Sequence, residues 1–148
     1  MAVHARTEVR DYVYGLIYNG STAAGTDVYD SRVWPYEDDD LPAVAVYALE
    51  DRTVGEVKAS GEVERLLILR VEMRAKAASG MEDTLDQLDA EVQALLLADS
   101  YLGGKVKDIQ HSETAIELSG DQEKPVGRAT ADYAILYRID QAAPDVLL

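Results

Sequence analysis

The chain has 148 residues, of which 14 are lysine or arginine and 28 are aspartate or glutamate, so its formal net charge is −14 with both histidines neutral. A charge this negative repels phosphate backbones and argues against direct nucleic-acid binding. The absence of cysteine excludes disulfides, thiolate metal sites and a cysteine nucleophile. The length suffices for one hydrophobic core, and we expect residues 1–148 to form a single domain.

The apolar runs of the sequence are short. The longest, 42–49 and 94–98, fall far short of the ~20 residues that a transmembrane helix needs. The first ten residues mix basic and acidic side chains where a signal peptide requires an apolar stretch. We therefore expect no membrane association, and we expect the chain to remain in the compartment where it is made.

The first half of the chain predicts one helix followed by strands. Apolar residues at three-to-four spacing indicate a helix over 4–19. A short strand is expected over 28–34. The next segment, 43–49, is apolar on both faces, as in a central strand of a covered sheet. The longest strand is predicted over 63–75, where apolar and charged side chains alternate.

A second helix is predicted after this strand. Ser79 and Glu82 have the spacing of a capping box, in which each side chain binds a free backbone amide of the first turn. The helix is expected to end near Asp99. Its apolar stripe comprises Met81, Leu85, Leu88, Val92, Leu95 and Leu96.

Two more strands complete the predicted fold. One covers 106–118 with an irregularity near His111, and the other covers 130–139 with alternate apolar side chains on one face. Residues 143–148 are expected to form a loose tail. The order of elements predicts an α+β fold with two helices packed on one face of a largely antiparallel sheet. A crossover through the second helix would make the sheet mixed, with one parallel pair.

No pattern in the sequence predicts a catalytic centre or a cofactor. No serine has the flanking glycines of a nucleophile elbow. The segment 103–105 lacks the first glycine and the hydroxyl residue of a phosphate-binding loop, so a turn is expected there. The two histidines, His4 and His111, are far apart in the chain and are expected at the surface. We expect no enzymatic activity.

The acidic run 37–40 is the best candidate for a metal site, because hard cations bind carboxylate oxygens. Adjacent side chains point in different directions, however, and the spaced pattern of a calcium loop is missing. A solvated loop is therefore the favoured interpretation, and no metal is expected. The carboxylates at 50–51 keep a metal site open as an alternative.

Two segments carry residues that are unusual for the surface of a monomer. Leu66 and Ile68 lie between Glu64 and Arg70 on the charged face of the strand predicted over 63–75. Either a hairpin of the same chain or a neighbouring subunit covers them. A second segment, 32–36, holds the residue types enriched at interfaces, although a lone tryptophan is also typical of a core. The candidate interface residues are Arg32, Trp34, Tyr36, Leu66, Ile68, Arg70 and Arg74.

The order and spacing of several segments resemble a known family. The strings 28–35 and 41–47 follow an amphipathic N-terminal helix, and the charged strand 63–75 precedes an acidic helix. A strand after Gly103-Gly104 and a closing strand over 133–137 complete the likeness. Over nearly its whole length the chain resembles the minor tail protein U family, the tail terminators of long-tailed bacteriophages.

The resemblance implies an α+β subunit that forms a hexameric ring on the end of the tail tube, stops tube polymerisation and provides the surface to which the head attaches. It implies three partners: other copies of the chain, the tail tube protein and the head–tail connector protein. It also implies assembly in the cytoplasm of a bacterial host and a final place at the tail end of the virion. No specific nucleic-acid recognition is implied, and an acidic ring lumen would let DNA pass without binding.

Two alternatives stay open. Another head–tail joining protein would share the small, ring-forming α+β subunit. The second alternative, which the sequence favours less, is a small acidic metal-binding module or enzyme centred on 37–40 and 50–51. A divalent ion would then raise the melting temperature of a monomer strongly.

The acidic loop yields a first testable prediction. Replacing Asp38, Asp39 and Asp40 with asparagine should leave the fold intact, because we expect these carboxylates to serve solubility or subunit contact. Circular dichroism and a screen for hydrolytic activity measure the outcome. Loss of a measurable hydrolytic activity in this variant would favour the enzyme alternative.

Overall fold

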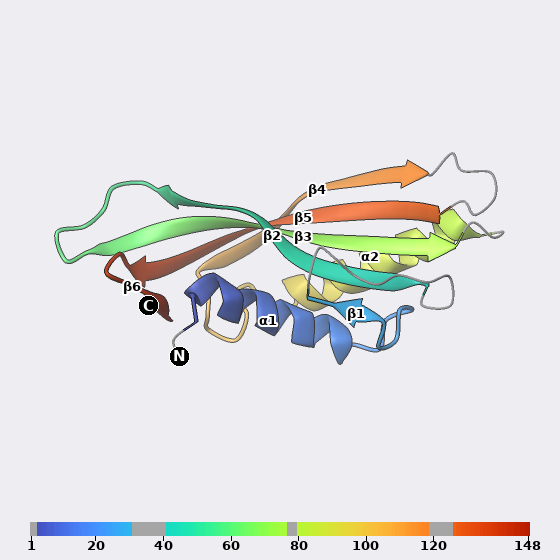
Figure 1. Ribbon diagram of the computed structural model, residues 1–148, viewed down its shortest axis with the longest axis horizontal. Helices are drawn as coiled ribbons and strands as arrows, with labels where there is room; N and C mark the ends of the chain where they lie inside the picture. The colour runs from blue at the N-terminus through green and yellow to red at the C-terminus, as the bar shows by residue number, and fades with distance from the viewer. Residues whose placement is uncertain (1–2, 31–40, 77–79, 119–125) are drawn as a thin grey trace.

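A computed structural model describes residues 3–30, 41–76, 80–118 and 126–148. Within these residues the strands form one sheet of order β1-β2-β3-β5-β4, and β6 pairs with β5 beside β4. Figure 1 shows the long, twisted strands with the helices beside them. The elements in chain order are α1 (Ala5–Tyr18), β1 (Val28–Tyr29), β2 (Ala43–Val54), β3 (Glu62–Lys76), α2 (Met81–Leu97), β4 (Asp108–Leu118), β5 (Val126–Asp140) and β6 (Ala143–Leu147).

The sheet confirms the predicted α+β class and corrects one detail of its topology. Every described pairing is antiparallel except that of β1 with β2. The parallel pair was expected from a crossover through α2. The crossover exists, but β5 lies between β3 and β4, so the two parallel strands that it joins are not neighbours.

One hydrophobic cluster holds the helices to the sheet, as the predicted stripes require. The residues Leu67, Leu69 and Val71 of β3 are fully buried on the face that both helices cover. Helix α2 lies over β3, β5 and β4, whereas α1 lies over β1 and β2 and packs against α2. Burial of each such side chain is worth roughly 1.5 to 3 kcal/mol. The helix residues in this cluster are Ala5, Val9, Val13 and Ile17 of α1, and Leu85, Leu88, Val92 and Leu96 of α2.

The first turn of α2 differs from the predicted capping box. Gly80 occupies the N-cap position with φ 88° and, as a glycine, has no side chain that could make a cap hydrogen bond. Ser79 lies outside the described residues. A left-handed backbone costs little for glycine, which has no Cβ, and this explains why Gly80 rather than a serine stands at the cap.

Glycine also sets the distance between α2 and the sheet. A Cβ atom at Gly127 of β5 would lie 2.6 Å from Sδ of Met81 and 3.0 Å from Cδ1 of Leu85. The absence of a side chain at this position therefore lets the start of α2 approach β5 closely.

The end of the chain is ordered, in contrast to the loose tail expected for 143–148. Residues 143–147 form β6, in which Leu147 pairs with Ile139 of β5, and the amide of Leu148 donates to the carbonyl of Arg138 at 2.9 Å. The free edge of β5 beyond β4 offers backbone partners to this segment, which the composition of the tail does not reveal.

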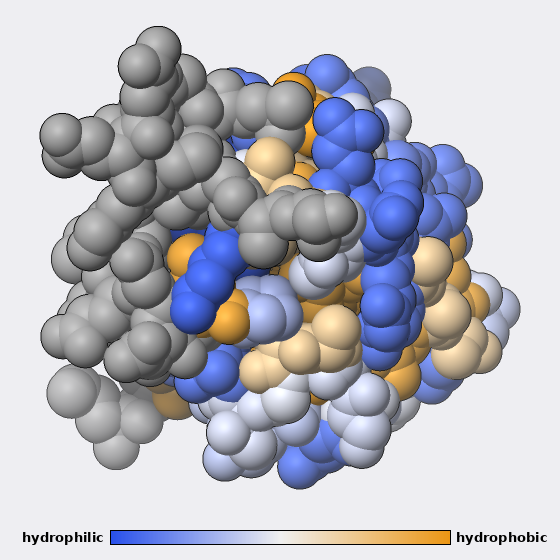
Figure 2. Space-filling model, turned by 90° about the vertical axis from the view of Figure 1, so that its right-hand side faces the viewer, coloured by the Kyte–Doolittle hydropathy of each residue, from blue (hydrophilic) through white to orange (hydrophobic). Residues whose placement is uncertain are grey.

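The two ends of the molecule differ. At one end the hairpin between β2 and β3 reaches beyond both helices (Figure 1). Figure 2 looks onto the opposite end, where a band of hydrophilic side chains lies beside apolar ones.

The packing of α2 generates a prediction about the core. Leu88→Asp should unfold the protein, because Leu88 is fully buried and the new carboxylate would have no partner. We expect a loss of at least about 4 kcal/mol in the free energy of unfolding. Gln87→Asp, on the neighbouring exposed position, is the matched control and should melt near the wild-type temperature. An unchanged melting temperature for Leu88→Asp by circular dichroism would contradict this core assignment.

Candidate interaction surface

The face of β3 and β5 that points away from the helices carries a short apolar strip. Leu66 lies opposite Leu136, and Ile68 lies opposite Ala134, in the antiparallel pairing of the two strands. All four side chains are half-buried. The prediction that Leu66 and Ile68 point away from the core is therefore confirmed, and we call these four residues the apolar strip.

An ion pair closes each end of the apolar strip. At one end Arg70 of β3 donates from Nε to Oδ1 of Asp132 at 2.8 Å and from Nη2 to Oδ2 at 3.0 Å. At the other end Arg138 of β5 donates from Nη2 to Oε1 of Glu64 at 2.9 Å. The hydrogen bonds to Asp132 raise the pKa of Arg70, so this guanidinium stays charged at any physiological pH. We call these the two flanking ion pairs.

Beyond Arg70 the same face carries a buried carboxylate, that of Glu72. The side chain of Glu72 is only 6% exposed and accepts from Tyr47 Oη at 2.9 Å and from Arg74 Nε at 2.8 Å. Burial is the main cause that raises the pKa of Tyr47, and the hydrogen bond to Glu72 raises it further. Arg128 reaches Glu72 at 3.5 Å and Glu117 at 3.0 Å. Arg74 is thus bound within its own chain.

Opposite charges cancel on the β2, β3 and β5 part of this face, and β4 adds the carboxylates of Asp108, Glu113 and Glu117. The side chains of β2, β3 and β5 that point away from the helices include six acidic and six basic residues. Helix α2 in contrast contains five acidic residues and no basic one. The acidic set on the face is Glu50, Glu62, Glu64, Glu72, Asp132 and Asp140, and the basic set is Arg52, Arg70, Arg74, Lys76, Arg128 and Arg138.

The predicted interface residues fall into two groups. Leu66, Ile68, Arg70 and Arg74 lie together on one face of β3, as alternation within a strand requires. The others, within 32–36, lie outside the described residues. Sequence reasoning missed the β5 half of the surface, although alternate charged and apolar residues between 128 and 140 provide the signal for it.

Asp51, a candidate metal ligand in the sequence, is bound by the protein itself. Its carboxylate accepts from Tyr137 Oη at 2.6 Å, from Arg6 Nη1 at 2.8 Å and from Arg65 Nε at 3.0 Å. Burial alone would raise the pKa of Asp51, but these hydrogen bonds together outweigh burial and lower it. Among the described residues, no group of three or more His, Asp or Glu side chains could hold a metal ion.

A register shift in β2 explains the direction of Asp51. Between Ala48 and Glu50 the pairing with β3 slips by one residue. The bulge turns Glu50 to the side of the apolar strip and turns Asp51 to the side of the helices. Glu50 pairs instead with Arg52 at 3.5 Å. As consecutive residues of a strand, the two carboxylates point to opposite faces of the sheet and cannot share one cation.

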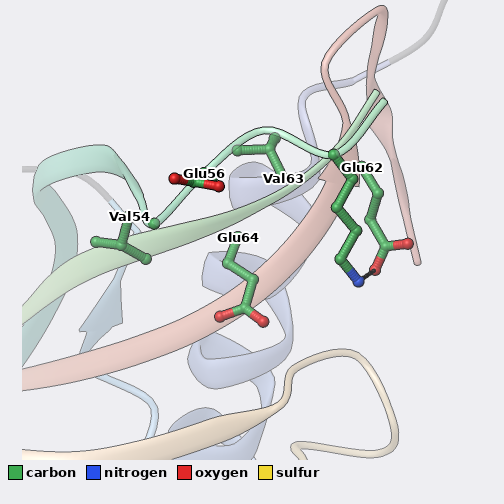
Figure 3. A pocket seen from close by; sticks show the side chains of 7 residues that line it. Val54, Glu56, Glu62, Val63 and Glu64 are labelled. Atoms are coloured by element: carbon green, nitrogen blue, oxygen red, sulfur yellow. Dashed lines mark ion pairs between the residues drawn. The ribbon is translucent and has the colours of Figure 1, made fainter. Parts of the chain in front are cut away.

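A shallow pocket lies at the hairpin between β2 and β3. Glu56, Glu62 and Glu64 line it together with Lys58. Figure 3 shows the three carboxylates pointing in different directions, and the ion pair of Lys58 with Glu62 spans 3.7 Å. Glu64 is engaged by Arg138 at 2.9 Å. The pocket thus lacks the converging carboxylates that acid–base chemistry requires.

The two histidines are half-buried rather than at the surface. His4 accepts the amide of Arg6 at 3.1 Å and caps α1. Nε2 of His111 lies 2.7 Å from Oγ1 of Thr114, and the imidazole ring packs edge-on against the ring of Tyr133. The irregularity predicted near His111 is confirmed by the register shift between His111 and Glu113. Burial raises the pKa of the neighbouring Asp89 on α2.

The fold and the surface together define a small α+β protein that carries an apolar strip between two ion pairs on one face of its sheet. No protein family matches the sequence, and no curated protein matches it. Among solved structures, a chain in the virion of a native gene transfer agent particle is similar, with a TM-score of 0.57 and 14% identity over 86% of this chain and 94% of that chain. At this identity the likeness shows a shared fold. Neither helix of the described chain is long and apolar enough to cross a membrane.

The contacts of Asp51 predict an acid-sensitive stability. Asp51→Asn should lower the free energy of unfolding by about 1 to 3 kcal/mol at pH 7, because Arg6 and Arg65 lose their charged partner. Since the folded state lowers the pKa of Asp51, its contribution is present above the ordinary value near 4 and is lost as the pH falls through the lowered value. The difference between wild type and variant, measured by urea denaturation, should therefore narrow below pH 4. Asp145→Asn, at an exposed position, is the control. Equal stability of Asp51→Asn and wild type at pH 7 would refute the assignment.

Proposed function

We propose that this chain is a structural component of a phage-like virion. The observation that carries the proposal is the shared fold with a chain of a gene transfer agent virion, which extends over 94% of that chain. A likeness that spans 86% of this chain and 94% of the other fits a subunit of the same kind better than a shared fragment does. The proposed role is structural and not enzymatic, in keeping with the paired state of Glu62, Glu64 and Asp51.

Within the virion we propose the role of a tail terminator. The resemblance of segments 28–35 and 41–47 to the minor tail protein U family supports this role. In it, copies of the chain form a hexameric ring at the end of the tail tube and stop its growth. The tail tube protein and the head–tail connector protein would be its neighbours, at the tail end of the virion.

The proposed contact between copies is the face that holds the apolar strip. Burial of Leu66 and Ile68 would contribute roughly 1.5 to 3 kcal/mol each per interface, repeated around a closed ring. Arg70 and Arg74 would contribute specificity more than affinity, because their charges are already paired within the chain. The same fold also supports another head–tail joining protein, and tail length separates the two roles.

The terminator role is tested with tail tubes. Wild-type protein added to polymerising tubes should form rings at their ends and limit their length, as measured by electron microscopy. Leu66→Glu with Ile68→Lys should stay folded by circular dichroism but neither form rings nor stop growth. Gln87→Glu with Ala90→Lys places the same charges on exposed positions of α2 and should behave as wild type. Tubes that grow without limit beside folded wild-type protein would overturn the terminator role.

A further inference from the structure

We propose that two copies of this chain pair face to face through the apolar strip and the two flanking ion pairs. Along β3 the side chains on this face run acidic, apolar, apolar, basic, and opposite them on β5 they run basic, apolar, apolar, acidic. Like charges therefore occupy diagonal corners of a rectangle with an apolar centre. The positions are Glu64, Leu66, Ile68 and Arg70 on β3, opposite Arg138, Leu136, Ala134 and Asp132 on β5.

This arrangement of charges is complementary to itself. A second copy turned over about a twofold axis along the strands lays its β3 on β5 of the first copy. Glu64 then faces Arg138, and Arg70 faces Asp132. An axis across the strands brings Glu64 over Arg70 instead, and Arg138 over Asp132. In both cases each carboxylate at a corner of the rectangle meets a guanidinium, and the apolar strip meets its own copy.

The strands beside β3 and β5 extend the complementarity. Arg52 of β2 lies next to Leu66, and Asp108 of β4 lies next to Leu136, on the same face. The axis along the strands brings Arg52 of one copy over Asp108 of the other. The complementarity is confined to the middle of the face, because the same axis brings Glu62 over Asp140 and Arg74 over Arg128, which are like charges.

The distribution of charge indicates why a second copy of the chain, rather than another protein, covers the apolar strip. Two chains of net charge −14 repel each other over most of their surfaces. The face described above is less acidic, because its acidic and basic side chains on β2, β3 and β5 cancel, and the excess comes from Asp108, Glu113 and Glu117 of β4 alone. A strongly basic partner would be attracted instead to α2, which holds five acidic residues and no basic one. At physiological salt, charges more than about 8 Å apart are screened, whereas the charges in contact still attract.

The proposed pair closes on itself. A twofold contact uses the same patch on both copies and therefore stops at two. Because the ring of the proposed function uses the same patch, the pair would be the unassembled form of the chain. Only this last step rests on the proposed function, and the pairing is measured without tail tubes.

A charge-inverted variant tests the pairing. Glu64→Arg, Arg138→Glu, Arg70→Asp and Asp132→Arg reverse every corner of the rectangle, but keep both ion pairs within the chain and leave the net charge unchanged. The inverted chain should pair with itself. It should not pair with wild type, because each carboxylate would then face a carboxylate. Since the exchange leaves the mass unchanged, one chain is isotope-labelled before native mass spectrometry of the mixture.

The expected result is dimers of each chain alone, with mixed dimers about tenfold rarer than in a mixture of labelled and unlabelled wild type. Mixed dimers in random proportion would overturn the proposal, and so would wild type that stays monomeric up to its solubility limit.

A second pair of variants keeps the test decisive if the inverted chain fails to fold. Leu66→Glu with Ile68→Lys should abolish the dimer, while Gln87→Glu with Ala90→Lys on α2 should retain it. Dimers that persist equally in both variants would overturn the proposal. Failure of the terminator role appears separately, in the tube-length assay, and does not change the outcome here.

Discussion

The structure depends on the way in which β3 divides its side chains between the two faces of the sheet. One row, with Leu67, Leu69 and Val71, is fully buried under the helices. The alternate row, with Leu66 and Ile68 between charged residues, faces the other way. Because the side-chain period of a strand is two, a slip of one residue would exchange these rows and put charges into the core. The core thus fixes the register that assembles the apolar strip.

The sequence predicted the parts of the fold that rest on strong periodicity. Leu85, Leu88 and Val92 define α2 whatever its neighbours, and the alternation of 63–75 defines β3. The strand β6 and the glycine cap at Gly80 were missed, because both depend on backbone conformation and pairing and not on hydrophobic pattern. Only the β3 half of the surface, with Leu66 and Ile68, was predicted. The partners of these residues on β5 follow only from the pairing of strands that are distant in sequence.

The bulge in β2 accounts for the surroundings of Asp51. The sequence placed Glu50 and Asp51 together as possible ligands, whereas neighbouring side chains of a strand point to opposite faces, and the register shift after Ala48 turns Asp51 toward the helices. Asp51 then meets Arg6, Arg65 and Tyr137, and ties the start of α1 to β2, β3 and β5. A shift of this kind has no signature in composition, since it depends on how two strands are matched over their whole length.

The central claim is that the apolar strip becomes covered by a second copy, and thiol labelling measures this directly. The chain has no cysteine, so Ile68→Cys introduces a single reactive thiol on the strip. The rate of its reaction with a maleimide should fall as protein concentration rises, whereas the rate for Gln87→Cys on the exposed face of α2 should stay constant. Equal and concentration-independent labelling at both positions would contradict the account.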